Sequence, residues 1–253
     1  MSVTLLTVEA SLSMPVASIL TLIMVIFIGY CNGITVVKSG LPSFIITLGS
    51  LFMVRGVTIA VSKMVTGRTQ LGGLEEAKGY NIMSSIFSNS LTISETDFPI
   101  SIFWWMLFGV LGYFLLKHTQ PGNWIFATGA SQESAKLMGI PVQKVKISLF
   151  MLTAFCSWFI AVTQVTTFGG ADVLRGEQKE FIAIIAAVIG GTLLTGGYGS
   201  IIGAMIGALI FGIVKQGIIF AGVDADWFQV FMGVMLVSAV LVNGTFRKKY
   251  AQG

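Results

Sequence analysis

Some polar side chains within the long apolar segments of this sequence could do chemistry there, and we single out six. They are Asn32, Thr47, Arg55, Thr192, Thr195 and Lys215. Hydroxyl and amide groups at membrane depth can hydrogen-bond a polar solute, and ionisable residues there are candidates for function. Arg55 and Lys215 each lie within about two helical turns of a segment end, so either could instead reach the headgroups. Since none of the six is a carboxylate, a carboxylate relay for proton or sodium coupling has no carrier.

No catalytic arrangement accompanies these residues. The one histidine, His118, is predicted at a helix end, where a solvated interfacial position is expected. The sequence contains no HExxH motif. Gly191 and Gly196 have the glycine spacing of a phosphate-binding loop, but Gly197 stands where that loop needs its lysine. We therefore predict a chain that is not an enzyme and binds neither ATP nor another cofactor itself.

The composition is typical of an integral membrane protein. Hydrophobic residues make up 55% of the chain and charged residues 10%, and the mean hydropathy is +0.87, whereas soluble chains carry about 25% charged residues. Most charge-free windows reach the ~20 residues that a helix needs to cross the hydrocarbon core. Cys31 and Cys156 lie in such windows and are expected to be reduced packing residues, with no disulfide or metal site.

These windows predict an all-α fold, a polytopic transmembrane helical bundle with about seven crossings plus a short cytoplasmic helix. The crossings are predicted at residues 14–37, 42–62, 100–116, 148–169, 181–195, 199–221 and 227–244. Placing the C-terminus in the cytoplasm puts eight basic residues and one acid inside, against five basic residues and ten acids outside. The eight are Lys38, Lys117, Lys136, Lys144, Lys146, Arg247, Lys248 and Lys249.

Glycines are concentrated between residues 190 and 214. Gly199, Gly203 and Gly207 form two overlapping GxxxG steps, and such small residues let membrane helices approach closely. We expect this face to pack against another helix. The run of residues 195–199 predicts a tight turn or a discontinuous helix that lines protein rather than lipid. The other interpretation is the glycine enrichment that is ordinary in membrane helices.

The polar loop of residues 117–146 carries the signals of a short helix at 129–141. Ser131 is a candidate N-cap, Glu133 falls in the first turn, Gly139 follows the last turn and Pro141 lies just beyond. Its partly apolar surface is expected to face the cytoplasm, where a partner could dock. Alternatively, this helix rests on its own membrane domain.

Three separated segments together resemble a known family. They are NGITVVKSGLPSFIITLGSLFMVRG (32–56), GNWIFATGASQESAKLMGIPV (122–142) and EFIAIIAAVIGGTLLTGGYGSIIGAMIGALI (180–210). The sequence is similar, from about residue 12 to residue 248, to the membrane permease subunit of bacterial ABC importers for monosaccharides of the ribose, xylose and galactose type.

The resemblance implies roles for two sets of residues. The 129–140 segment matches the family's coupling helix, which fits a groove on the ATP-binding subunit. The coupling candidates are Ser131, Glu133, Ala135, Lys136, Leu137 and Gly139. The 44–56 and 181–197 segments match the two halves that line the central path. The translocation-path candidates are Asn32, Phe44, Thr47, Arg55, Phe181, Thr192 and Thr195.

Partners and location are implied in the same way. The resemblance places the chain in the bacterial inner membrane, where two permease copies move a monosaccharide inward by alternating access. A cytoplasmic ABC ATPase binds ATP and magnesium, and an extracytoplasmic sugar-binding protein delivers the sugar. Its docking surface is expected on the charged loop 63–99, unless that loop is only solvated. No nucleic-acid partner is expected.

The sequence departs from the family at its start. Members begin with a further apolar helix and a glycine-rich stretch close to GGIDLSVG, and neither precedes Met1. We therefore expect residues 1–253 to form a single permease domain that lacks the family's N-terminal part. Two alternatives stay open: a permease for branched-chain amino acids or nucleosides, and a channel or carrier that works alone.

Overall fold

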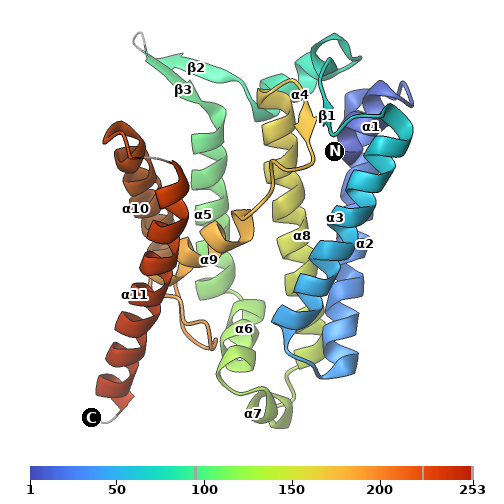
Figure 1. Cartoon of the computed structure of the whole chain (residues 1–253). Coiled ribbons are helices and arrows are strands. Elements are labelled where there is room, and N and C mark those ends of the chain that lie inside the picture. Colours follow the sequence, from blue (N-terminus) through green and yellow to red (C-terminus); the bar gives the residue numbers. More distant parts are fainter. Residues whose placement is uncertain (94–95, 224, 252–253) are drawn as a thin grey trace. The chain divides into compact units, whose positions relative to one another are not determined.

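The computed structural model describes residues 1–93, 96–223 and 225–251. In the last helix the side chains are described through Leu241, so those of Arg247, Lys248 and Lys249 lie outside the described part. Within it, five helices are long and apolar enough to cross a membrane. They are α2 (Met14–Ser39), α3 (Ser43–Thr66), α5 (Ile100–His118), α8 (Val142–Thr167) and α10 (Ile201–Phe220). These helices confirm the predicted all-α membrane class (Figure 1).

The remaining elements are shorter, apart from the last helix. The helices are α1 (Ser2–Val8), η1 (Leu74–Glu76), α4 (Tyr80–Phe87), α6 (Gln120–Ala130), α7 (Gln132–Leu137), α9 (Lys179–Ile189) and α11 (Ala225–Ala251). The strands are β1 (Gln70–Leu71), β2 (Ser90–Ile93), β3 (Thr96–Pro99) and β4 (Ala171–Asp172). The helix α11 contains the apolar stretch Trp227–Leu241 and covers the last predicted crossing.

The chain divides into two compact units, which are described one at a time. Unit 1 comprises Met1–Trp105 and Gln143–Gly176, and unit 2 comprises Met106–Val142 and Glu177–Gly253. The single permease domain expected from the sequence stays a prediction.

Glycines bring two long helices of unit 1 into close contact. A Cβ on Gly29 of α2 would lie 2.8 Å from the Cβ of Ala154 in α8, and one on Gly33 would lie 3.0 Å from the Cα of Ile147. Only residues without a side chain fit at this spacing, as is usual where membrane helices pack. The left-handed Gly40 then ends α2, and α3 packs back against it.

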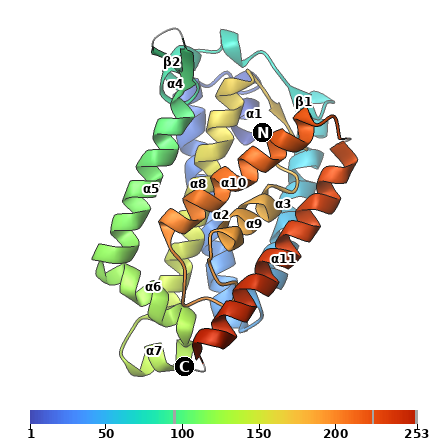
Figure 2. The ribbon, with the colours of Figure 1, turned by 90° about the vertical axis from the view of Figure 1, so that its left-hand side faces the viewer.

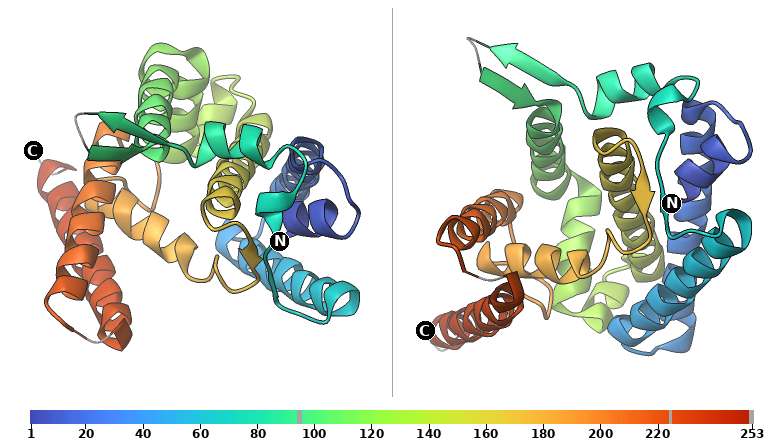
Figure 3. Two further views of the ribbon diagram at one scale, coloured as in Figure 1. Left: turned by 90° about the horizontal axis from the view of Figure 1, so that it is seen from above. Right: turned by 45° about the horizontal axis from the view of Figure 1, so that its top comes forward.

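A folded cap joins the helix ends of unit 1; we define it as residues 67–93 and 168–176. The strands β1 and β4 pair antiparallel, with Gln70 opposite Asp172. Figure 3 shows the β2–β3 hairpin leading from α4 into α5. The loop 63–99 expected from the sequence is therefore largely structured.

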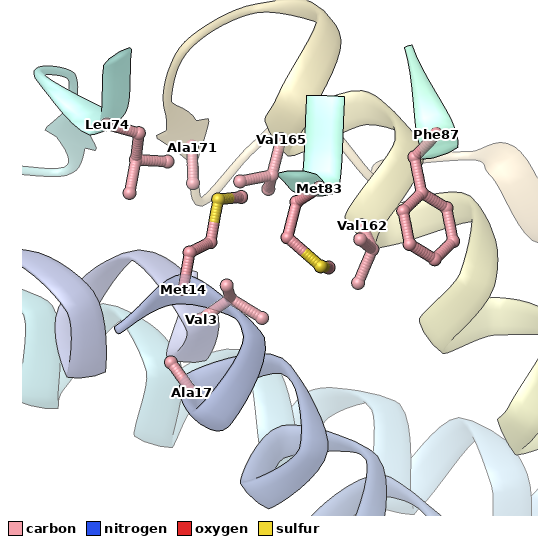
Figure 4. Close-up of a cluster of buried hydrophobic side chains, with 9 residues drawn as sticks. All are labelled: Val3, Met14, Ala17, Leu74, Met83, Phe87, Val162, Val165 and Ala171. Atoms are coloured by element: carbon pink, nitrogen blue, oxygen red, sulfur yellow. The ribbon is translucent and has the colours of Figure 1, made fainter. Parts of the chain in front are cut away.

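The core of the cap is apolar, which explains why it folds. Side chains from α1, α2, η1, α4, α8 and β4 form one buried cluster (Figure 4). Its members are Val3, Met14, Ala17, Leu74, Met83, Phe87, Val162, Val165 and Ala171. Burying a side chain such as Leu74 contributes about 1.5–3 kcal/mol. The cluster thus fixes the cap onto the ends of α2 and α8.

In unit 2, α9 packs against both α10 and α11 (Figure 2). One buried side chain from each helix, Ile185, Phe211 and Met232, forms the centre of this packing. The helix α10 also packs on α5: a Cβ on Gly112 would lie 3.2 Å from the side chain of Ile201. The helix α10 thus contacts three neighbours within this unit, α9, α11 and α5.

Two predictions about segment structure were wrong. The crossing predicted at residues 181–195 is instead the 11-residue helix α9, whose length of about 16 Å is half of the ~30 Å hydrocarbon core. The helix stops because Gly191 adopts a left-handed φ of 86°. The thirty-residue loop expected at 117–146 is mostly helical, since α6 and α7 lie within it and α8 begins at Val142.

Candidate functional site

The short helix α7 has the boundaries that its residues predict. The Ser131 hydroxyl accepts a hydrogen bond from the Ser134 amide at 3.2 Å, so Ser131 is the N-cap. Glu133 lies in the first turn, where the helix dipole favours an acid. At the other end the Gly139 amide donates to Lys136 O and the Ile140 amide to Ala135 O, each at 3.0 Å. With φ of 78° at Gly139, this is a Schellman ending. The predicted N-cap, first-turn acid and final glycine are confirmed.

The residues at α7 differ in exposure: one is buried, and others form an exposed surface. Leu137 and Met138 are 86% and 67% exposed, whereas Ala135 is fully buried. Ala135, which the sequence predicted as part of the partly apolar exposed surface, is therefore not part of it. Glu133 and Lys136 are exposed. The result is a small apolar surface flanked by charges of both signs, and such a surface can bind a protein partner.

The helix α6 leads into α7 without a linker. Ser131 is at once the C-cap of α6 and the N-cap of α7. At its start, α6 is capped by Thr119, whose hydroxyl accepts the Gly122 amide at 3.3 Å. The position of α7 is therefore set by α6.

A compact loop of residues 191–199, here called the glycine loop, connects α9 to α10. It begins with a Schellman ending on α9, since the Thr192 amide donates to Ala187 O and the Gly191 amide to Val188 O. It closes on itself through a 3.1 Å hydrogen bond from the Leu193 amide to Tyr198 O. Gly196 and Gly197 both have positive φ. These features confirm the discontinuous backbone predicted here.

The helices on either side of the glycine loop pack backbone to backbone. A Cβ on Gly203 would clash with the Gly190 carbonyl, and one on Gly207 with the Ala186 carbonyl. The predicted packing role of Gly203 and Gly207 is thus confirmed, with α9 as the partner. Gly199 precedes the N-cap Ser200 and therefore does not extend the GxxxG step; its Cα instead faces Thr192.

Sequence reasoning missed the residues that complete this packing. Ala186 and Gly190 lie four positions apart on α9, the same spacing of small residues that identified Gly203 and Gly207. That spacing could have located both. Gly129, which contacts the glycine loop, follows no such pattern and could not have been found this way.

The path candidates fall in both units. In unit 1, the Asn32 amide donates to the Ser50 hydroxyl at 2.9 Å and so joins α2 to α3. Thr47 bonds to its own helix through Ser43 O at 2.9 Å, Phe44 is exposed and Arg55 is half-buried. In unit 2, Phe181 and Thr195 are exposed and Thr192 is half-buried. Their role as one path stays a prediction.

One carboxylate of the cap, Asp172, has a lowered pKa because of its hydrogen bonds. The Asp172 carboxylate accepts hydrogen bonds from the Leu174 amide at 2.8 Å and from Gln70 Nε2 at 2.6 Å. Both bonds lower the pKa of Asp172 below its ordinary value, and the bond from the Leu174 amide has the larger effect. The positive charge of Arg175 lowers this pKa further. Arg175 itself stacks over the Phe168 ring at 4.4 Å.

Metal-ligating and thiol groups are few in the described part of the chain. Within it, no group of three or more His, Cys, Asp or Glu residues could hold a metal ion. Cys31 and Cys156 are both free thiols there.

Known proteins resemble this chain over most of its length. Residues 1–240 match the family described as branched-chain amino acid transport system / permease component. The fructose import permease FrcC of Rhizobium meliloti is 30% identical over 87% of this chain and 60% of its own length. The ribose import permease RbsC of Escherichia coli K12 is 29% identical, over 85% of this chain and 64% of its own. The autoinducer 2 permease LsrD of Salmonella paratyphi B is 28% identical, over 92% and 68%.

The chain spans less than two thirds of the length of its first curated relatives. No solved structure matches it. The family match nevertheless covers all described elements up to Val240 in α11, including α7, the half-length α9 and the glycine loop. The chain therefore belongs to the family of branched-chain amino acid transport system permease components.

Proposed function

We propose that this chain is the permease subunit of an ATP-driven ABC importer that moves a monosaccharide or a similar polyhydroxylated solute into a bacterial cell. The observation that carries the proposal is α7, a helix capped at both ends that presents Leu137 and Met138 to water. An exposed apolar surface held this rigidly marks an interaction site. The relatives are named as import permeases for fructose and ribose, which supports the solute class.

The partners follow from this role. A cytoplasmic ATPase, which holds ATP and magnesium, binds α7; an extracytoplasmic binding protein docks on the cap of unit 1, and a second permease copy completes the path. The chain lies in the inner membrane with α7 and the C-terminus in the cytoplasm, as the excess of basic residues on that side supports.

No bond of the solute changes in this process. The solute exchanges water for hydroxyl and amide groups, which Asn32, Thr47, Thr192 and Thr195 supply, while Phe44 and Phe181 offer aromatic faces. Alternating access then requires only that ATP binding and hydrolysis shift the population of inward- and outward-open states. The protein's task is to couple α7 to that shift.

A matched pair of leucine variants tests the docking surface. Leu137→Glu places a charge on the exposed face of α7, and Leu174→Glu does the same at an exposed turn of unit 1. Because a buried unpaired charge costs several kcal/mol, we expect Leu137→Glu to abolish co-purification of the cognate ATPase and Leu174→Glu to retain it. Equal ATPase recovery from both variants and wild type would contradict the proposal.

The family description favours one other solute class, branched-chain amino acids. Uptake of labelled ribose, fructose and leucine into vesicles that hold the permease, its ATPase and its binding protein separates the two classes. We expect uptake of a sugar and not of leucine. Leucine uptake alone would overturn the assignment to sugars and leave the importer intact.

A further inference from the structure

The end of α6 meets the glycine loop backbone to backbone. A Cβ on Gly129 would lie 2.5 Å from the Gly197 nitrogen, and one on Gly197 would lie 2.8 Å from the Cα of Ala130. Gly196 is also close to Gly129: a Cβ there would lie 2.9 Å from its carbonyl oxygen. No flexible side chain separates the two segments. We call this contact the junction and define it as Gly129 and Ala130 against Gly196 and Gly197.

Both sides of the junction are stiff. On one side Ser131 ends α6 and begins α7, so a displacement of α7 acts on Gly129 and Ala130 directly. On the other side the loop is braced by the bond from the Leu193 amide to Tyr198 O and by one from the Gly196 amide to Leu193 O, at 3.0 Å. Close-packed contacts of this kind transmit strain rather than absorb it.

The glycine loop continues this connection to α9. Its first residues carry the Schellman ending of α9, and the α9 backbone is packed on α10 through Gly190 and Gly203. The same loop carries Thr192 and Thr195, two of the path candidates. A shift of the loop therefore repositions their hydroxyl groups and the end of α9 together.

We infer that the junction is the mechanical link by which movement of α7 reaches the glycine loop and the half-length helix α9. This inference rests on the proposed function, because it takes an ATPase as the source of the movement. Gly129, Gly196 and Gly197 are then positioning residues that act through Thr192, Thr195 and α9. Their lack of side chains is required for coupling as well as for packing.

Cysteine labelling in the assembled transporter tests the link directly. Leu194 lies in the glycine loop and is 62% exposed, so Leu194→Cys can report on the loop after Cys31→Ser and Cys156→Ala remove the native thiols. In the otherwise wild-type complex with its ATPase, we expect ATP with vanadate to change the labelling rate at Leu194→Cys by about fivefold or more, the lower end of typical coupling.

A matched pair of glycine variants then locates the link. Gly129 and Gly212 both lie within helices, but a Cβ meets the Gly197 backbone at the first position and nothing within 4 Å at the second. We expect Gly129→Ala to keep membrane insertion and ATPase co-purification, to lose the nucleotide-dependent labelling change, and to reduce uptake about tenfold, which corresponds to about 1.4 kcal/mol. Gly212→Ala should match wild type in every measurement.

The outcomes separate the inference from the proposed function. Two outcomes overturn the inference alone. One is normal uptake together with a labelling rate at Leu194→Cys that does not change with nucleotide. The other is a labelling change in Gly129→Ala as large as in the protein with Gly129. A wild-type complex that binds no ATPase and imports nothing overturns the proposed function. If Gly129→Ala does not insert, Ala130→Gly loosens the same junction. It is expected to shrink the labelling change, and an unchanged response there counts against the link.

Discussion

At the scale of single residues, glycine sets how closely the backbones of unit 2 pack. Gly203 and Gly207 let α10 lie on the α9 backbone, and Gly129 lets α6 meet the glycine loop. Membrane helices gain little from burying apolar side chains against one another, so close backbone contact carries much of their association. The absence of a side chain at these positions is thus a structural requirement, whereas Gly212 on the same helix meets nothing.

A pair of leucine substitutions on α10 measures this requirement. Gly203→Leu forces the side chain into the Gly190 backbone, and overpacking of this kind costs about 1–3 kcal/mol or more. We expect Gly203→Leu to lower the melting temperature in detergent and the yield of folded protein, and Gly212→Leu to change neither. The same melting temperature in Gly203→Leu as in wild type would show that its face meets only lipid.

At the scale of elements, the short strand pair β1–β4 joins two segments of the cap. Asp172 in β4 binds Gln70 of β1 and the Leu174 amide, and these bonds to the ionised carboxylate lower its pKa. A carboxyl whose folded pKa is lowered stabilises the fold above its unfolded value of about 3.9 and loses this contribution as the pH falls through the folded pKa.

The contribution of the Asp172 carboxylate to stability can therefore be measured from the pH dependence of the melting temperature. Because this group is largely exposed, solvent limits its contribution to about 1 kcal/mol or less. We expect the melting temperature of wild type to fall more than that of Asp172→Asn as the pH is lowered from 5 to about 3, and the two to differ most at neutral pH. Parallel pH profiles would show that the carboxylate adds nothing to the strand pair.

Local signals predicted the elements that depend on local contacts. The ends of α7 follow from Ser131 and Gly139, which act within a few residues. The break after α9 could not be located from hydropathy, because residues 181–214 contain no charged residue and glycine is common in membrane helices. The cap was also missed, since Leu74 and Phe87 are buried in one cluster with Val162 and Val165, whose distance along the chain leaves no local pattern.

At the scale of the whole molecule, one helix predicts how unit 1 lies in the membrane. Lys144 lies in the first turn of α8, and Gly169, just past its end, contacts Glu75 of the cap. The 26 residues of α8 extend about 39 Å, which exceeds the ~30 Å hydrocarbon core. We therefore predict that α8 crosses the membrane with Lys144 and the cap on opposite sides, and the positive-inside rule predicts the cytoplasmic side for Lys144.

Labelling of single cysteines in intact cells tests this placement with two exposed residues of the same compact unit. In a background without Cys31 and Cys156, we expect a membrane-impermeant maleimide to label Glu75→Cys from outside and Lys144→Cys only after the membrane is opened. Labelling of both from outside would mean that α8 does not cross. The reverse pattern would mean that α8 crosses the membrane in the opposite orientation. It would then place the start of α8, and with it α7 just before it in the chain, on the side where no ATPase can bind.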